Sequence, residues 1–239
     1  MTGIKLTRHA LGGKVPLIGF VGGPWTLLAY SIEGKSSKNW SSAKRALYQY
    51  PNKCKELLRI YTDATIAHLI GQVQAGAQAL EVFESCAGHL SPNMFREFVM
   101  PELKRIYKEV KESKLLQNAK EIPMILFARE VNIKLDELRK ECPYEVYAIG
   151  WGKDSSSARE EIGVDGVLQG NLDPWCLYGD NKCIKTNVYK MLDEFKVVKQ
   201  DKKGLIVNLG HGMMPGMQPK SVNTVIQSVR DYEKEKFGK

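Results

Sequence analysis

The sequence lacks any apolar run long enough to cross a membrane. Its longest apolar stretches, such as VPLIGFVGG, fall far short of the roughly 18 to 20 residues that a spanning helix needs. The first residues, MTGIKLTRHALGGK, also lack the apolar core of a secretory signal. We therefore expect a cytoplasmic protein with no membrane partner.

Cysteines are few, odd in number and never spaced as CxxC, which argues against a disulfide framework or a structural zinc site. We interpret them as small thiols in a reducing compartment. Cys86 and His89 have an i, i+3 spacing that could bind a metal, but no convincing third ligand accompanies them. We expect no metal site.

Nucleotide and nucleic-acid signatures are also missing. No strand is followed by GxGxxG or GxxxxGK[ST], so the phosphate-binding loops of nucleotide enzymes are not supported. The formal net charge is +8, but the basic residues are spread along expected helices and mixed with glutamates, as in KRIYKEVKESK. Without an RNP motif, a finger or a basic stripe, we expect no nucleic-acid partner.

Short apolar segments alternate with amphipathic ones along the whole chain. The apolar segments are largely non-alternating, as in strands buried on both faces. The expected strands are Val15–Gly22, Ala79–Ser85, Pro123–Ala128, Glu145–Gly150, Gly166–Gly170 and Leu205–Gly210. The expected helices are Asn52–Ala75, Pro92–Lys114, Leu135–Lys140, Ser156–Ile162, Ile184–Phe195 and Ser221–Lys236.

This repeated βα order predicts an α/β fold with a parallel sheet. A doubly wound open sheet and a (β/α)8 TIM barrel lacking two units both fit six strands. The missing dinucleotide fingerprint favours the barrel. Several strands end in glycine-rich or polar turns, and active sites of both architectures lie at the carboxyl ends of the strands.

Two of these strand ends carry candidate functional residues. His211 stands between Gly210 and Gly212, which would let the backbone turn tightly and approach a ligand; a structural hydrogen-bonding histidine is the alternative. Ser85 could donate a hydrogen bond to an anion, and its neighbour Glu84 is either a general base or the buried partner of a cation.

The segment GFVGGPWTLLAY predicts a strand, a tight turn and a helix that opens near a proline. Phe20 could pack against a flat ligand above the sheet, and Tyr30 could present its hydroxyl from the helix. Core packing is the alternative for Phe20 and Trp25. In GNLDP, we interpret Asp173 as a helix cap, a structural role.

Together these segments resemble the uroporphyrinogen decarboxylases. The resemblance rests on VPLIGFVGGPWTLLAYSIEG, GAQALEVFESCAGHLSP, PMILFA, LQGNLDP and NLGHGMMP, in that order, and covers essentially all 239 residues. It implies one (β/α)8 barrel domain of this type, a homodimer and an enzyme without a cofactor. The implied reaction is a decarboxylation that converts uroporphyrinogen III to coproporphyrinogen III in haem biosynthesis. The substrate-binding positions of the family fall on Tyr30, Ser85, His211, Phe20 and Phe83.

The chain also departs from the family's pattern. It has no RQAGRY-type segment and no aspartate before Asp63, and Ile149-Gly150-Trp151 stands where the family has Asp before Trp. We therefore expect a barrel of about six βα units, with no catalytic residue identified and little decarboxylation by this chain as given. One alternative is a non-catalytic porphyrinogen-binding or dimerising relative. The other is a corrinoid methyltransferase-like barrel, against which the residues after His211 argue.

Overall fold

The computed structural model describes residues 1–163, 165–196 and 204–238. Six strands alternate with helices, so the α/β fold and all six predicted strands are confirmed. The strands are β1 (Ile18–Gly22), β2 (Ala79–Glu84), β3 (Met124–Ala128), β4 (Val146–Ala148), β5 (Val167–Leu172) and β6 (Leu205–Leu209). The chain divides into two compact units, Met1–Tyr147 (unit 1) and Ala148–Lys239 (unit 2), each described by itself.

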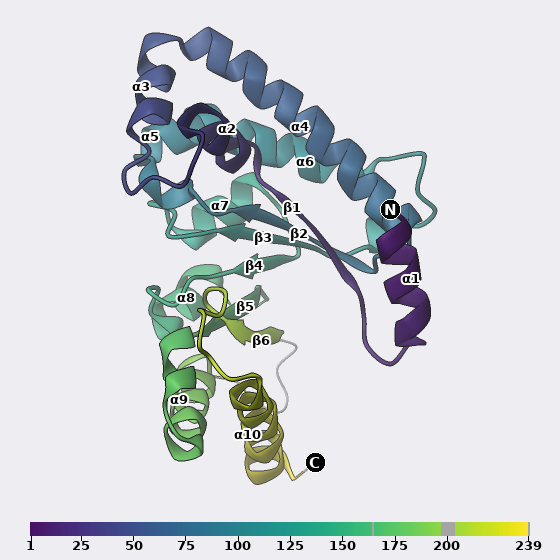
Figure 1. Cartoon of the computed structure of the whole chain (residues 1–239), viewed down its shortest axis with the longest axis vertical. Helices are drawn as coiled ribbons and strands as arrows, with labels where there is room; N and C mark the ends of the chain where they lie inside the picture. Colours follow the sequence, from purple (N-terminus) through teal and green to yellow (C-terminus); the bar gives the residue numbers. More distant parts are fainter. Residues whose placement is uncertain (164, 197–203, 239) are drawn as a thin grey trace. The chain divides into compact units, whose positions relative to one another are not determined.

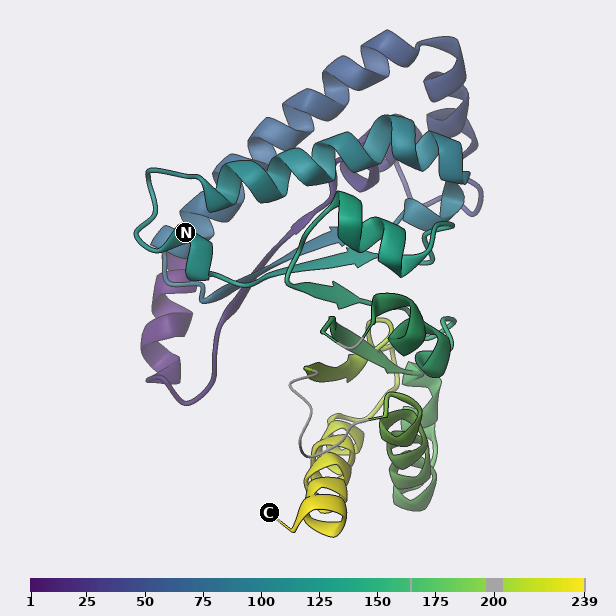
Figure 2. The same cartoon turned by 180° about the vertical axis from the view of Figure 1, so that it is seen from behind.

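Unit 1 is built on the parallel strands β1, β2 and β3 (Figures 1 and 2). Gly22 lies opposite Phe83 of β2, and Phe83 lies opposite Phe127 of β3. Because side chains alternate along a strand, Phe20 shares the sheet face of both other phenylalanines. The helices of unit 1 are α1 (Thr2–Leu11), α2 (Pro24–Glu33), α3 (Ser41–Gln49), α4 (Pro51–Gln74), α5 (Pro92–Met94), α6 (Met100–Lys111) and α7 (Leu135–Glu141).

Helix α4 covers the opposite face of this sheet. Gly19 faces the helix closely, since a side chain there would meet Gln72, which is buried and donates from Nε2 to the Phe20 carbonyl at 2.7 Å. Leu58 and Leu69 are almost fully buried, as the apolar periodicity of α4 predicts. Trp25 of α2 is fully buried, which confirms the core-packing alternative for that residue.

The predicted continuous helix 92–114 is wrong in detail. Ser91 caps α5, as predicted, accepting from the Met94 amide, but Phe95–Val99 is a π-helical segment before α6 begins. Pro101 lacks an N–H and therefore cannot continue the i→i−4 ladder, which gives a physical reason for the interruption. The sequence patterns also did not predict α1 and α3, which bury few or no side chains.

Unit 2 pairs β5 with β6 in parallel, with Leu168 opposite Leu205. Its helices are α8 (Ser155–Ile162), α9 (Asn181–Glu194) and α10 (Pro219–Phe237), and α9 packs against α10 (Figure 1). No helix among the described residues has the length and apolar character to span a membrane.

The prediction that every strand is buried on both faces is wrong for β1 and β6. Ile18 and Phe20 are 40% and 64% exposed, and burial alternates along β6. Each of these strands pairs on one side only within its unit, with β2 and β5 respectively. Phe20 is therefore not a core residue, so the core-packing alternative fails for this side chain.

Candidate functional site

A row of three phenylalanines crosses the sheet of unit 1 near the carboxyl ends of its strands. The Phe20 and Phe83 rings are 5.8 Å apart at 80°, and the Phe83 and Phe127 rings are 5.8 Å apart at 78°. Edge-to-face contacts of this kind are favourable for aromatic pairs. The two predicted phenylalanines thus lie together. Sequence reasoning missed Phe127, although it and Phe83 each occupy the penultimate position of their strands.

Tyr30 lies in the last turns of α2, with its ring against a second aromatic group. Its centroid is 4.7 Å from that of Trp40, and Trp40 is 6.1 Å from the His89 ring. Trp40 is buried, whereas Tyr30 is 46% exposed. Within the described part of the chain the Tyr30 hydroxyl has no hydrogen-bond partner. An exposed hydroxyl on a fixed ring is available to a ligand.

Glu84 ends β2 and has a structural role that neither sequence interpretation anticipated. Its fully buried carboxylate accepts hydrogen bonds from the Trp25 amide at 3.1 Å, from the Thr26 amide at 2.7 Å and from the Thr26 hydroxyl. It caps the amino end of α2, where Gly23 has no side chain to do so. Burial raises the pKa of Glu84 to about 7, against these hydrogen bonds, which lower it.

Ser85 follows directly and is half-buried, and no described residue hydrogen-bonds its hydroxyl. The next residue, Cys86, donates its amide to the Thr26 hydroxyl, so the serine sits on a backbone fixed to α2. Burial raises the pKa of Cys86 to about 11, which makes it a poor thiolate. Among the described residues, no group of three His, Cys, Asp or Glu side chains could hold a metal ion.

His211 lies in unit 2, just after β6, and is partly buried, with its Nδ1 3.2 Å from the Gly212 carbonyl. Neither flanking glycine has a positive φ, and the need for glycine at one of them comes from packing within unit 2. A Cβ at Gly210 would lie 2.6 Å from the Trp151 Cα, whereas a Cβ at Gly212 would meet nothing within 4 Å. Gly210 is thus required by the close passage of the strand end past the Trp151 backbone.

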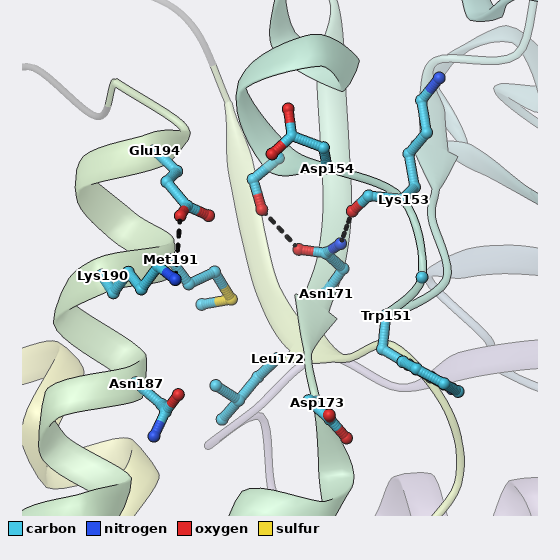
Figure 3. A pocket seen from close by; sticks show the side chains of 12 residues that line it. Trp151, Lys153, Asp154, Asn171, Leu172, Asp173, Asn187, Lys190, Met191 and Glu194 are labelled. Atoms are coloured by element: carbon cyan, nitrogen blue, oxygen red, sulfur yellow. Dashed lines mark hydrogen bonds and ion pairs between the residues drawn. The ribbon is translucent and has the colours of Figure 1, made fainter.

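A polar pocket of about 330 Å³ opens in unit 2 beside the end of β5 (Figure 3). The buried Asn171 amide donates to the carbonyls of Gly150 and Lys153, and its oxygen accepts from Ser155. These bonds fix the loop that carries Trp151, which is 45% exposed. Asp173 caps the short helix η4 (Pro174–Tyr178) through the Trp175 amide, which confirms its predicted structural role.

Comparison with known proteins assigns the chain to a family. The uroporphyrinogen decarboxylase (URO-D) family model matches residues 1–232. The chain belongs to the uroporphyrinogen decarboxylase family. Proteins named uroporphyrinogen decarboxylase from Danio rerio and Homo sapiens are 45% and 44% identical to it, over 97% of this chain and 61% of theirs. The relative from Schizosaccharomyces pombe is 42% identical over 97% of this chain and 64% of its own.

The chain therefore spans about three-fifths of the length of these decarboxylases. Among solved structures, a methyltransferase from Methanosarcina mazei matches with a TM-score of 0.72, over 96% of this chain and 62% of that one. At 19% identity this likeness shows a shared fold and nothing about chemistry. The family match and this neighbour support the predicted barrel of about six βα units.

Proposed function

We propose that this chain binds uroporphyrinogen III at the carboxyl ends of its strands, as part of an enzyme that forms coproporphyrinogen III. The observation that carries this proposal is the phenylalanine row, found in a chain that the family model matches over residues 1–232. A large apolar macrocycle needs a broad aromatic surface, and Phe20, at 64% exposed, provides one.

In this proposal the aromatic residues Phe20 and Phe83 contact the macrocycle. The polar residues Tyr30, Ser85 and His211 donate hydrogen bonds to its carboxylate arms. The Tyr30 and Ser85 hydroxyls have no partner among the described residues, so binding a carboxylate breaks no internal bond.

The reaction removes carbon dioxide from each acetate arm. A pyrrole ring accepts a proton, the bond between the methylene carbon and the carboxylate breaks, and its electron pair flows into the cationic ring. Release of the ring proton and protonation at the methylene carbon leave a methyl group. The donors proposed here orient the arms, and stabilisation of the ring cation requires a negative charge.

We propose that residues 1–239 belong to one barrel domain of a homodimeric cytoplasmic carboxy-lyase that uses no metal or organic cofactor. It binds neither nucleic acid nor membrane.

Equilibrium binding of uroporphyrin III, the stable oxidised form of the substrate, tests the proposal through quenching of tryptophan fluorescence. We expect saturable binding, weakened about threefold to tenfold by Tyr30→Phe, Ser85→Ala or His211→Ala, the loss of one donor each. Tyr50→Phe is the matched control, because Tyr50 is 56% exposed and lies outside the phenylalanine row. Saturable binding that none of the three variants changes would refute the assignment of donors.

A further inference from the structure

Three cationic or cation-forming side chains from three separate elements of unit 1 lie near one another, since the charges of Lys44 and Arg129 both act on His89. Lys44 comes from α3, His89 from the short helix η1 (Ala87–His89) after β2, and Arg129 from the residue after β3. All three are half-buried. We call them the rim cluster.

A pocket of about 330 Å³ opens at this cluster. Its lining residues are Lys44, Tyr48, His89, Leu90, Ser91 and Met94. Burial is the first cause that lowers the pKa of His89 below its ordinary value. The positive charges of Arg129, at the end of β3, and of Lys44 lower it further. Glu130 acts in the opposite direction, as the weakest of these causes.

The loops that carry the cluster are held together by hydrogen bonds. The Gly88 amide donates to the Arg129 carbonyl at 2.9 Å, and the Asn132 amide group donates to the carbonyls of Gly88 and Leu90. The two loops approach so closely that a Cβ at Gly88 would lie 2.7 Å from the Glu130 carbonyl oxygen. The positions of His89 and Arg129 are thus fixed before any ligand arrives.

Neither Lys44 nor Arg129 has a direct counterion among the described residues of unit 1, although the charge of Glu130 acts on His89. Across the part of unit 1 that the structure describes, the Lys44 ammonium and the Arg129 guanidinium form no ion pair or hydrogen bond. By contrast, Arg96 and Arg105 on the outer helices both pair with carboxylates. Half-buried like charges repel one another, and an anionic ligand would relieve that repulsion.

We infer that the rim cluster binds a carboxylate arm of the tetrapyrrole substrate, beside the donors Tyr30 and Ser85. This inference rests on the proposed function. His89 is joined to Tyr30 through Trp40, with ring centroids 6.1 Å and 4.7 Å apart, so the cluster borders the proposed site. Lysine and arginine are the side chains best suited to a carboxylate, and the arginine fork can bind both oxygens.

Paired titrations of the full 239-residue chain test this inference. Uroporphyrin III carries eight carboxylates and coproporphyrin III four, and the quenching of tryptophan fluorescence reports binding of both. We expect Lys44→Met and Arg129→Met each to weaken uroporphyrin binding about tenfold, the loss of one charge-assisted hydrogen bond, and coproporphyrin binding less. His89→Gln should weaken uroporphyrin binding less than Lys44→Met or Arg129→Met does. Lys44→Arg and Arg129→Lys should largely restore it.

Lys108→Met is the charge-matched control, since Lys108 is an exposed lysine in the last turn of α6. Circular dichroism and the melting temperature verify that each variant is folded. If wild type and the rim variants bind uroporphyrin equally while Tyr30→Phe weakens it, the inference is wrong and the proposed function stands. If wild type binds neither porphyrin, both are wrong. Equal losses for Lys108→Met and Lys44→Met would indicate a general charge effect and overturn the inference.

Discussion

The two glycines that flank His211 offer a sharp test of the structure, because only one of them is sterically required. In Gly210→Ala, the new methyl would lie 2.6 Å from the Trp151 Cα and 2.7 Å from its Cβ. Carbon atoms in contact are normally about 3.5 to 4.0 Å apart, so the strand end and the Trp151 loop must separate by roughly 1 Å. Overpacking of this kind costs typically 1–3 kcal/mol, and backbone atoms yield less easily than side chains. We therefore expect Gly210→Ala to lower the free energy of unfolding by about 3 kcal/mol.

Gly212→Ala is the matched control, since a Cβ there meets nothing within 4 Å. Surface changes of this kind usually stay within about 0.5 kcal/mol. Thermal unfolding followed by tryptophan fluorescence compares the two variants. For a chain of this size, about 3 kcal/mol corresponds to a fall in melting temperature of roughly 6–12 °C. Equal melting temperatures for Gly210→Ala and Gly212→Ala would refute the close passage of Gly210 past Trp151.

Further predictions concern buried charges in unit 1. Because the pKa of Glu84 is raised to about 7 in the fold, folding binds a proton there, and stability should fall as pH rises from about 4.5 through 7. Urea unfolding across this pH range should show that wild type loses on the order of 3 kcal/mol of its free energy of unfolding, and that Glu84→Gln does not. The same dependence of stability on pH in both proteins would contradict this prediction. Lys111 is 8% exposed and pairs with Glu145 at 2.8 Å while donating to the Ile122 carbonyl at 2.6 Å. Lys111→Met should destabilise by about 2 kcal/mol, and Lys104→Met, which breaks a surface pair with Glu141, by less than about 1 kcal/mol. Comparable losses in the two variants would refute the burial argument.

The strands are predictable from sequence because each is a short apolar run bounded by turns, and this signal depends on neighbours along the chain. The same apolar signal does not predict which side chains of a strand are exposed to solvent. Phe20 reads as a core residue by type, but its exposure depends on which strand edge is paired, and that is a property of the tertiary structure. The helix break before α6 needed only Pro101, a local signal that the apolar periodicity of the segment outweighed.

Some residues of the candidate site could also be predicted from sequence, whereas others could not. Phe20 and Phe83 were found from strand ends and family resemblance, and Phe127 carried the same positional signal. Glu84 could not be assigned from sequence, because its partners are backbone amides 58 and 59 residues away. The rim cluster was equally hidden, because its three members come from segments that only the fold brings together.

The most direct test of the proposed porphyrinogen site is the dissociation constant of uroporphyrin III for wild type and Phe83→Ala. Phe83 stands at the centre of the row, in edge contact with both Phe20 and Phe127. Loss of its half-buried ring should weaken binding by about tenfold, or about 1.4 kcal/mol, while the circular dichroism spectrum is retained. Wild-type binding without saturation, or equal affinities for the folded Phe83→Ala variant and wild type, would contradict the account.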